Sequence, residues 1–352
     1  MLKDNMLQVV KSLPKIDLHL HLDGSVKPKT VLELATEQGV ALPKSDLSSL
    51  KPYLQIEDDC PDLKSYLSKF DLVSQVLHTE KALERVAFEL VEQAHSQNCK
   101  YIEVRFGPQL HRQKGLSLEV VIGSVIKGLN KGEQTFGVRA KAIACCLRHH
   151  SVEVNMEVIE AASSFLNSGL VGVDLAGDEA SYPAYLFRSV FKIADKKGLP
   201  ITIHAGEAAG ANNIKDAIHK LGASRIGHGV RLKEDMSLFN EVYSRGIPLE
   251  MCPISNIQTK ASDSWKEYPI REYFDQGLLV TVNTDNLTVS KTTLTKEYMI
   301  LAKHFEFTTS ELAQLVMNGI EASFLEVSDK KELKNICLQE YKQLEGKISE
   351  VI

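Results

Sequence analysis

Eight short apolar runs, separated by longer stretches with helical periodicity, constrain the fold of this chain more than any other feature. Each run has the length of one β-strand, and continuous apolar runs of this length are typical of parallel strands that are buried on both faces. We therefore expect strands at Ile16–Leu22, Tyr101–Phe106, Ala140–Leu147, Leu170–Ala176, Pro200–His204, Arg225–Val230, Pro248–Cys252 and Leu278–Val282.

The stretches between most of these runs repeat apolar residues with the period of a helix. Examples are Asn155–Asn167 and Tyr185–Lys197, and the second is followed by Gly198, a helix C-terminus signal. Strands that alternate with helices predict an α/β fold, here a TIM-type (β/α)₈ barrel. The alternative is an open doubly wound sheet, but the chain lacks the G-x-G-x-x-G fingerprint after an early strand.

The segment between the first two predicted strands, roughly residues 24 to 100, is unusually long. We expect extra helices inserted after strand 1, with residues 45 to 75 forming a lid. The tail after about Phe324 is charged and helical in character. Neither segment resembles an independent domain, and 352 residues suit one elaborated barrel. We therefore predict a single domain over residues 1–352.

The composition restricts the binding partners and the cellular compartment that can be expected for this protein. The formal net charge of -5 argues against binding to a nucleic-acid backbone. No window of about 18 apolar residues predicts a membrane span, and the polar N-terminus lacks a signal-peptide core. No C-x-x-C pair occurs, so we expect reduced, mostly buried thiols in a cytoplasmic protein. The cysteines are Cys60, Cys99, Cys145, Cys146, Cys252 and Cys337.

Polar residues lie at the ends of four of the predicted strands. They are His19 and His21 in the first, His204 and Glu207 at the fifth, His228 in the sixth, and Asp285 and Asn286 after the eighth. The C-terminal ends of barrel strands converge on one mouth, where barrel enzymes carry out their chemistry. Burying so many polar groups without partners would be costly. The pattern therefore predicts a functional site at the mouth.

Three imidazoles and one carboxylate suit Zn²⁺, which takes nitrogen and oxygen ligands where thiolates are absent. We predict one zinc ion held by His19, His21, His204 and Asp285. Zinc lowers the pKa of a bound water toward about 7, which supplies a nucleophile at neutral pH. Glu207 and His228 are then acid or base groups beside it.

A lone histidine in an apolar strand is more often a core residue than a ligand, so the other histidines are expected to have structural roles. His149 and His150 follow the third strand and are candidates for lining the mouth, and Cys252 is expected to pack near the seventh strand. The remaining histidines are His78, His95, His111, His219 and His304.

Six motifs between residues 13 and 286 resemble those of the adenosine deaminase family of metal-dependent amidohydrolases, in the family's order. They are LPKIDLHLHLDGS, VDLAGDE, ITIHAGE, RIGHGV, CPISNIQTKA and VTVNTDN. The segment DLKSYLSKF, residues 62–70, resembles the apolar gate over the purine. The NTDN and SNIQTKA forms resemble the bacterial branch.

The resemblance implies a role for each matching residue. The zinc ligands are His19, His21, His204 and Asp285, with His21 also beside the substrate. Glu207 matches the acid that protonates purine N1, and His228 matches the residue that orients or deprotonates the attacking water. Asp285 could also accept a hydrogen bond from that water. Gly177 matches the backbone donor to N3, Asp23 the carboxylate that holds the ribose 5′-hydroxyl, and Leu63, Tyr66, Leu67 and Phe70 the gate.

Asn286 departs from the commoner pattern, because many members have Asp at the position facing purine N7. N7 only accepts hydrogen bonds, and a carboxamide can donate without first being protonated. We hypothesise that Asn286 donates an N–H to N7. The alternative is that Asn286 only braces the loop after the eighth strand.

The resemblance implies hydrolytic deamination of adenosine, and of 2′-deoxyadenosine, to inosine and ammonia in purine salvage. The partner would be a small purine nucleoside. Alternatives are deaminases of adenine or of a modified adenine nucleotide, although Asp23 would repel a 5′-phosphate. A metal-dependent hydrolase of another substrate would have no need of the gate and Gly177. A catalytically silent binding protein would have no need of the acid and base groups.

Overall fold

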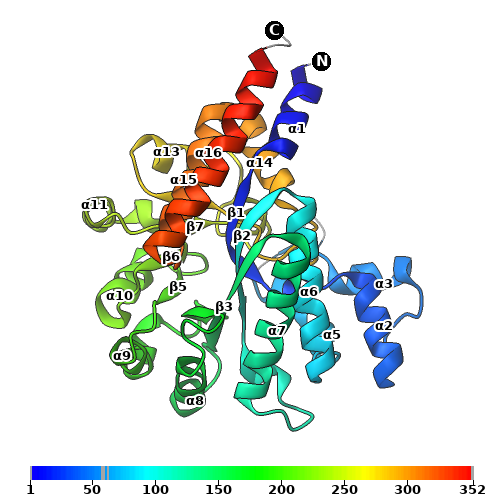
Figure 1. The fold of residues 1–352 in the computed structure, drawn as a ribbon. Coiled ribbons are helices and arrows are strands. Elements are labelled where there is room, and N and C mark those ends of the chain that lie inside the picture. The colour runs from blue at the N-terminus through cyan, green and yellow to red at the C-terminus, as the bar shows by residue number, and fades with distance from the viewer. Residues whose placement is uncertain (1, 57–59, 62, 350–352) are drawn as a thin grey trace.

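The computed structural model describes residues 2–56, 60–61 and 63–349, and its centre is a barrel of parallel strands (Figure 1). Helices surround the strands on the outside. The strands are β1 (Lys15–His21), β2 (Cys99–Phe106), β3 (Arg139–Leu147), β4 (Leu170–Ala176), β5 (Thr202–Ala205), β6 (Arg225–His228), β7 (Leu249–Met251) and β8 (Val280–Val282).

Two parallel runs of strands, β1-β2-β3-β4 and β5-β6-β7-β8, are joined into a closed ring. One junction pairs Val173 with Ile201, and the Val173 N–H donates to the carbonyl of Pro200 at 2.9 Å. The other pairs Leu20 with Asp285, whose N–H donates to the carbonyl of His19 at 2.8 Å. This closure confirms the predicted barrel and excludes the open doubly wound sheet.

All eight predicted strands are present, and the differences lie at their ends. β4 matches its apolar run, and every residue in it is buried. β6 ends at His228, two residues before the predicted end, because His228 and Gly229 adopt positive φ angles of 64° and 69° that turn the chain out of the sheet. β7 is short because α12 begins at Pro253, and proline has no N–H for strand pairing.

Helices follow most strands and cover the barrel, and both predicted examples are present with shifted bounds. The first begins at Val152 because the Ser151 side chain accepts the N–H of Val154, a typical N-cap. The second is divided between η3 (Ala184–Phe187) and α9 (Arg188–Lys196), and it ends before Gly198, as predicted. The first example is α8 (Val152–Ser163), and the other helices on the barrel are α7 (Leu118–Phe136), α10 (Ala211–Leu221), α11 (Met236–Arg245), α12 (Pro253–Gln258), α13 (Ile270–Asp275), α14 (Leu294–His304), α15 (Thr309–Ala322), η2 (Pro108–His111) and η4 (Val230–Glu234).

The long insertion after β1 is helical, as predicted. It contains η1 (Asp23–Ser25), α2 (Pro28–Gln38), α3 (Leu47–Leu54), α4 (Leu63–Leu67), α5 (Phe70–Ser74) and α6 (Glu80–Ser96). The predicted lid, residues 45 to 75, includes α3, α4 and α5, whereas its residues 57–59 and 62 lie outside the described residues.

The two ends of the chain come together at one end of the barrel (Figure 1). They form α1 (Leu2–Ser12) and α16 (Val327–Ser349), so the charged tail is helical, as predicted. Asn98, just before β2, links them because its Nδ2 donates to the carbonyl of Ser12 at 2.7 Å and to Glu340 at 3.4 Å. This end is opposite the strand ends that carry the predicted site, because α1 leads into the first residue of β1.

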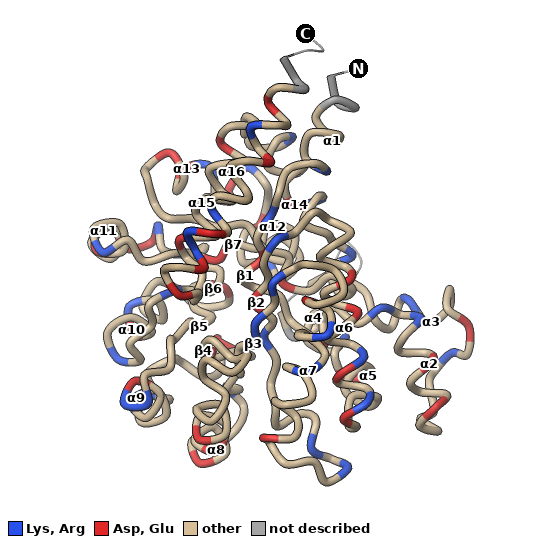
Figure 2. Tube along the Cα trace, in the orientation of Figure 1, with Lys and Arg blue, Asp and Glu red and all other residues tan. Residues whose placement is uncertain are grey.

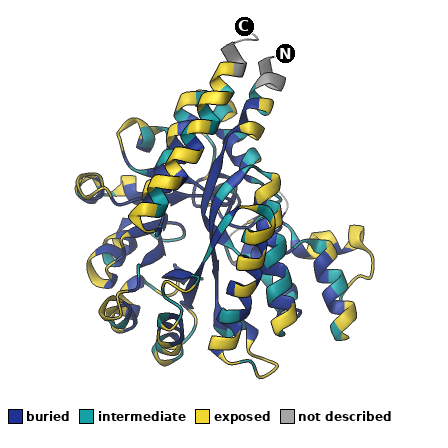
Figure 3. Ribbon diagram, in the orientation of Figure 1, coloured by how far each residue is buried: buried dark blue, intermediate teal, exposed yellow. Residues whose placement is uncertain are grey.

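Burial follows the two layers of the barrel. The strands are buried over most of their length, and the helices are exposed mainly on their outer faces (Figure 3). Basic and acidic side chains are interspersed on outer helices such as α11 and α16 (Figure 2). Among the described helices, none has both the length and the apolar composition that crossing a membrane requires.

Candidate active site

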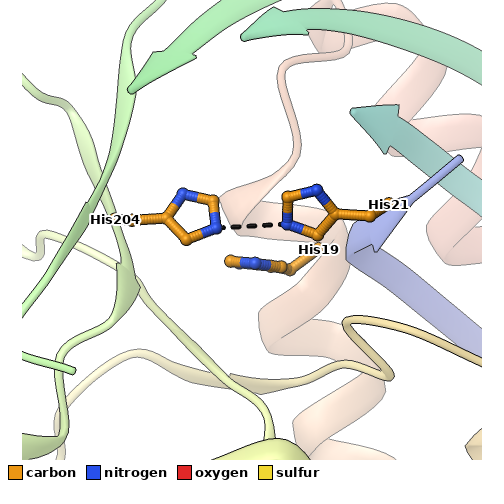
Figure 4. A group of neighbouring side chains, drawn as sticks. All are labelled: His19, His21 and His204. Carbon is orange, nitrogen blue, oxygen red and sulfur yellow. Dashed lines mark hydrogen bonds between the residues drawn. The ribbon is translucent and has the colours of Figure 1, made fainter. Parts of the chain in front are cut away.

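The four predicted metal ligands meet at the C-terminal mouth of the barrel. Nε2 of His21 and Nε2 of His204 are 3.2 Å apart, although they come from β1 and β5 (Figure 4). Oδ1 of Asp285 lies 3.3 Å from Nε2 of His21 and 3.4 Å from Nε2 of His19. Two overlapping trios, His19–His21–His204 and His19–His228–Asp285, each bring their ligand atoms within 4.8 Å of one another.

This arrangement fits a bound cation. Nε2 of His19 is buried and has no hydrogen-bond partner among the described residues. Such an orphaned atom costs free energy unless something binds it. A carboxylate and imidazole nitrogens with facing lone pairs form a nitrogen and oxygen donor set suited to a transition metal.

Buried carboxylates hold the outer nitrogens of two of these histidines. Glu250 in β7 lies 2.8 Å from Nδ1 of His19, and Asp174 in β4 lies 2.9 Å from Nδ1 of His204. A carboxylate at Nδ1 fixes the proton there and directs the Nε2 lone pair inward. Both rings are therefore oriented before any ion binds.

Two buried arginines keep these carboxylates charged. Arg105 in β2 donates to Asp174 at 3.0 Å and to Glu250 at 2.7 Å, and Arg225 in β6 also pairs with Glu250. Burial alone would raise the pKa of Glu250, but the charges of Arg105 and Arg225 hold that pKa well below its usual range. This network was not predicted from the sequence. The signal that could have found it is the presence of charged residues inside four of the apolar runs: Arg105, Asp174, Arg225 and Glu250.

Glu207 and His228 lie beside the ligand cluster, with Oε2 of Glu207 3.5 Å from Nε2 of His228. Burial raises the pKa of the Glu207 carboxyl to about 8, and the negative charges of Asp285 and Glu179 add to the rise. Glu207 is therefore largely protonated at pH 7, which suits a general acid.

The proton of His228 can be assigned from its neighbours. Oδ1 of Asn256 accepts the N–H of Cys252 at 3.2 Å and the hydroxyl of Tyr268 at 3.0 Å. Its Nδ2 therefore faces Nδ1 of His228, 2.9 Å away, and donates to it. Nδ1 is the acceptor, so neutral His228 carries its proton on Nε2, toward Glu207. Asn256 is a second functional residue that the sequence analysis missed.

A cavity of about 460 Å³ opens over these groups. This volume is in the range of small-molecule sites. Among the described residues that line it, acidic and apolar side chains predominate and none is Lys or Arg. The lining includes the predicted residues His21, Asp23, Leu63, Tyr66, Leu67, Phe70, Gly177, His204, Glu207, His228, Asp285 and Asn286.

The lid helix α4 is attached to the mouth by a polar contact. The Tyr66 hydroxyl lies 2.6 Å from Oγ of Ser290 and accepts a hydrogen bond from Nδ2 of Asn286 at 2.9 Å. Tyr66 is therefore more than an apolar gate residue, since its hydroxyl bridges α4 and the loop after β8. Asn286 has two N–H groups, so a second donor remains for a ligand.

Close packing at Asn286 explains the glycine of the DGS motif. A Cβ added at Gly24 would lie 1.7 Å from Oδ1 of Asn286. A side chain at residue 24 would therefore displace the amide.

The histidines outside the predicted site differ in whether they lie at the cavity. His149 lines the cavity, and His150 packs edge-on against it with ring centroids 4.4 Å apart. The other five, from His78 to His304, do not line the cavity. Cys252 is fully buried beside β7, and all six cysteines are buried, as predicted.

Comparison with known proteins gives one consistent family. The family model for adenosine deaminase matches residues 14–339. An adenosine deaminase of Clostridium perfringens is 43% identical over 323 residues, covering 92% of this chain and 97% of the relative. Two solved structures have similar folds. One is an adenine deaminase from Arthrobacter aurescens, at 29% identity, TM-score 0.86 and coverage of 94% and 98%. The other is an Arabidopsis N6-mAMP deaminase, at 28% identity, TM-score 0.84 and coverage of 94% and 99%.

Proposed function

The chain belongs to the adenosine deaminase family, and we propose that its barrel mouth deaminates adenosine hydrolytically to inosine and ammonia. The observation that carries this proposal is the meeting of three imidazoles and a carboxylate beside Glu207, whose pKa is raised to about 8 by burial, at one cavity. Hydrolytic deamination needs a nucleophile at C6, a proton for N1 and an exit for ammonia. The cavity supplies groups for each of these needs.

We propose Zn²⁺ as the ion, held by His19, His21, His204 and Asp285. When bound there, Zn²⁺ would supply a water of lowered pKa at neutral pH. Asp285 is prepared for this role because Ser255 donates to its Oδ2 at 2.6 Å, which directs Oδ1 toward the imidazoles. Zinc is proposed because three imidazole nitrogens and one carboxylate oxygen are ligands that it prefers.

The remaining steps belong to side chains of the chain. Glu207 would donate its proton to N1, which reduces the aromatic character of the ring and makes C6 electrophilic. His228, fixed by Asn256, would orient the attacking water. Water adds at C6, one of its protons leaves with the amino group as ammonia and the other restores the Glu207 carboxyl, so adenosine and water give inosine and ammonia.

The cavity favours a nucleoside over a nucleotide. Asp23 is buried at the mouth, where it could accept a hydrogen bond from the ribose 5′-hydroxyl and would repel a phosphate. The ribose 2′-hydroxyl has no assigned partner, so 2′-deoxyadenosine is also a proposed substrate. We also propose a cytoplasmic location, which the buried cysteines support because such thiols suit a reducing compartment.

The test is the loss of adenosine absorbance near 265 nm after mixing with zinc-loaded enzyme. Metal-stripped protein should be inactive and regain activity with added Zn²⁺. Adenosine should exceed adenine and AMP in kcat/KM, because sites that bind a substrate hydroxyl discriminate strongly against analogues that lack it. Better turnover of AMP would favour the nucleotide alternative, and full activity without a transition metal would end the zinc proposal.

A further inference from the structure

One buried carboxylate holds the whole loop that carries Glu207. Oε1 of Glu179 accepts the N–H of Gly206 at 2.7 Å. Its Oε2 accepts the N–H groups of Glu207, Ala208 and Ala209 at 3.0, 2.8 and 3.1 Å. Glu179 is only 1% exposed, and its contacts with Gly206 and Glu207 are buried, whereas those with Ala208 and Ala209 are partly buried. Charge-assisted hydrogen bonds of this kind are stronger than neutral ones.

The opposite side of the same loop is also fixed. The backbone N–H of Arg231 donates to the carbonyl of Gly206 at 3.0 Å, and Nε of Arg231 donates to the carbonyl of Glu207 at 3.3 Å. The backbone at Glu207 is therefore held through its N–H by Glu179 and through its carbonyl by Arg231. Only side-chain rotation remains free for the Glu207 carboxylate.

Glu179 belongs to a different loop, the one after β4, and lies two residues beyond Gly177. Gly177 has a φ angle of 100°, a conformation that L side chains rarely adopt. The loops after β4 and β5 are neighbours because these strands pair at Val173 and Ile201. Glu179 therefore connects the loop of Gly177 to the loop of Glu207.

We propose that Glu179 is a positioning residue that sets the spacing between the Gly177 N–H and the Glu207 carboxylate. This inference rests on the proposed function, in which those two groups address N3 and N1 of the same purine ring. N1 and N3 lie on the same side of the six-membered ring, separated by one carbon. Both contacts can form together only if the two loops keep one fixed distance.

A carboxylate suits this position because it only accepts hydrogen bonds, and every contact described here is a donor. Burial raises the pKa of Glu179, and the charge of Arg148 and the backbone N–H groups of the loop oppose that rise. A glutamine keeps the size of the side chain but presents an NH₂ group toward at least one of the N–H donors. Glu179→Gln should therefore loosen the loop without creating a large cavity.

The experiment compares Glu179→Gln with Glu133→Gln in the zinc-loaded enzyme. Glu133 is the matched control because it also accepts a backbone N–H, from Ala140 at 3.2 Å, and it does not line the cavity. Both variants are measured for kcat and KM with adenosine. Inhibition constants are measured for purine riboside, 1-deazaadenosine and 3-deazaadenosine, which respectively keep both ring nitrogens, lack N1 and lack N3. Hydrogen exchange of the amides at residues 206–209 and zinc content are measured on the same samples.

We expect Glu179→Gln to keep its zinc and lose roughly 10- to 100-fold in kcat, because small displacements of a catalytic group cost about this much. KM should change less than kcat. The preference for purine riboside over both deaza compounds should shrink, and the amides at 206–209 should exchange faster. Glu133→Gln should stay within about twofold of wild type, as expected for a change away from the cavity.

Three outcomes would overturn the inference. One is a folded Glu179→Gln enzyme that keeps wild-type discrimination at N1 and N3. The second is loss of discrimination at only one nitrogen, which would make the residue a support for one loop alone. The third is a variant that cannot fold or bind zinc, which would make Glu179 structural. If wild type itself shows no discrimination, the proposed roles of Glu207 and Gly177 fail instead.

Discussion

At the scale of single residues, the site depends on side chains whose second hydrogen-bonding atom is already occupied. His19, His204 and His228 each have one ring nitrogen bound to Glu250, Asp174 or Asn256, which leaves the other nitrogen directed at the cavity. Preorganisation of this kind reduces the cost of holding an ion or a transition state. Changing these partners should therefore affect function without changing any group that touches substrate.

The first prediction concerns Asp174→Asn. Asparagine can no longer attract the Nδ1–H of His204 with a full charge, so zinc should bind about 10- to 100-fold more weakly. Competition against a chelator of known affinity measures this change. Glu241→Gln is the control, because Glu241 pairs with the surface His219 at 3.0 Å, away from the cavity. Equal zinc affinities in the two variants would show that Asp174 does not support the metal site.

The second prediction concerns Asn286→Ala. If Asn286 donates to N7, its loss should lower kcat/KM for adenosine by roughly ten- to a hundredfold, the equivalent of an unmade buried hydrogen bond of about 1–3 kcal/mol. With 7-deazaadenosine the same variant should lose little, because that contact is already absent. Equal losses on both substrates would favour the bracing role, which the contact with Tyr66 also allows.

At the scale of elements, we make one prediction for the helices inserted after β1 and one for α14. The lid helices border the cavity through Leu63, Tyr66, Leu67 and Phe70, so closure there would exclude water. Phe70→Ala removes a partly buried ring that packs near Tyr66, with centroids 6.3 Å apart. We expect KM to rise more than kcat falls in steady-state kinetics. A change in kcat alone would count against the gate.

A buried carboxyl in α14 predicts a pH dependence of stability. Glu297 is fully buried, where it accepts the N–H of Ile254 at 3.1 Å and contacts Thr292 at 2.6 Å. Burial raises its pKa to about 8 from an ordinary value of 4.5. The folded state therefore holds a proton that the unfolded state has released, so stability falls as pH rises from 4.5 toward 8. The slope from one such group is at most about 1.4 kcal/mol per pH unit.

Glu297→Gln should remove this component, because an amide is neutral at every pH in that range. Urea unfolding at pH 5.5, 6.5 and 7.5 would show a flatter dependence of the unfolding free energy than in wild type. The idea fails if the two proteins have parallel pH profiles.

At the scale of the whole molecule, the metal should connect distant parts of the ring. The predicted ligands come from β1, β5 and the residue after β8, so an ion held by them would join strands that are far apart in sequence. Zinc at a hundredfold excess over its dissociation constant should stabilise the fold by about 2.7 kcal/mol. Calorimetry should give a higher Tm for zinc-loaded than for stripped protein, with one main transition for the predicted single domain. Two separate transitions would contradict that domain prediction.

Local sequence determined the strands and the set of residues at the mouth. A strand buried on both faces must be apolar over its length, so each of the eight runs marked its own strand. Alternation with helices restricted the topology, and strand ends then brought His19, His204 and Asp285 to one side. The motifs added the expected roles, and the structure places those residues along the lining of one cavity, except His19, which lies buried in the ligand cluster.

Only the tertiary structure decided which polar groups pair. The contacts of Glu250 with His19, of Asn256 with His228 and of Tyr66 with Asn286 join residues 28 to 231 positions apart. Such pairings depend on distances across the closed barrel. The local pattern of a sequence does not specify distances between residues that are far apart along the chain. The ends of β6 and β7 were also decided there, because the backbone turns where the mouth requires it. For the same reason, nothing in the sequence distinguishes Glu179 from other acidic residues. In the folded chain it connects the loop after β4 to the loop after β5.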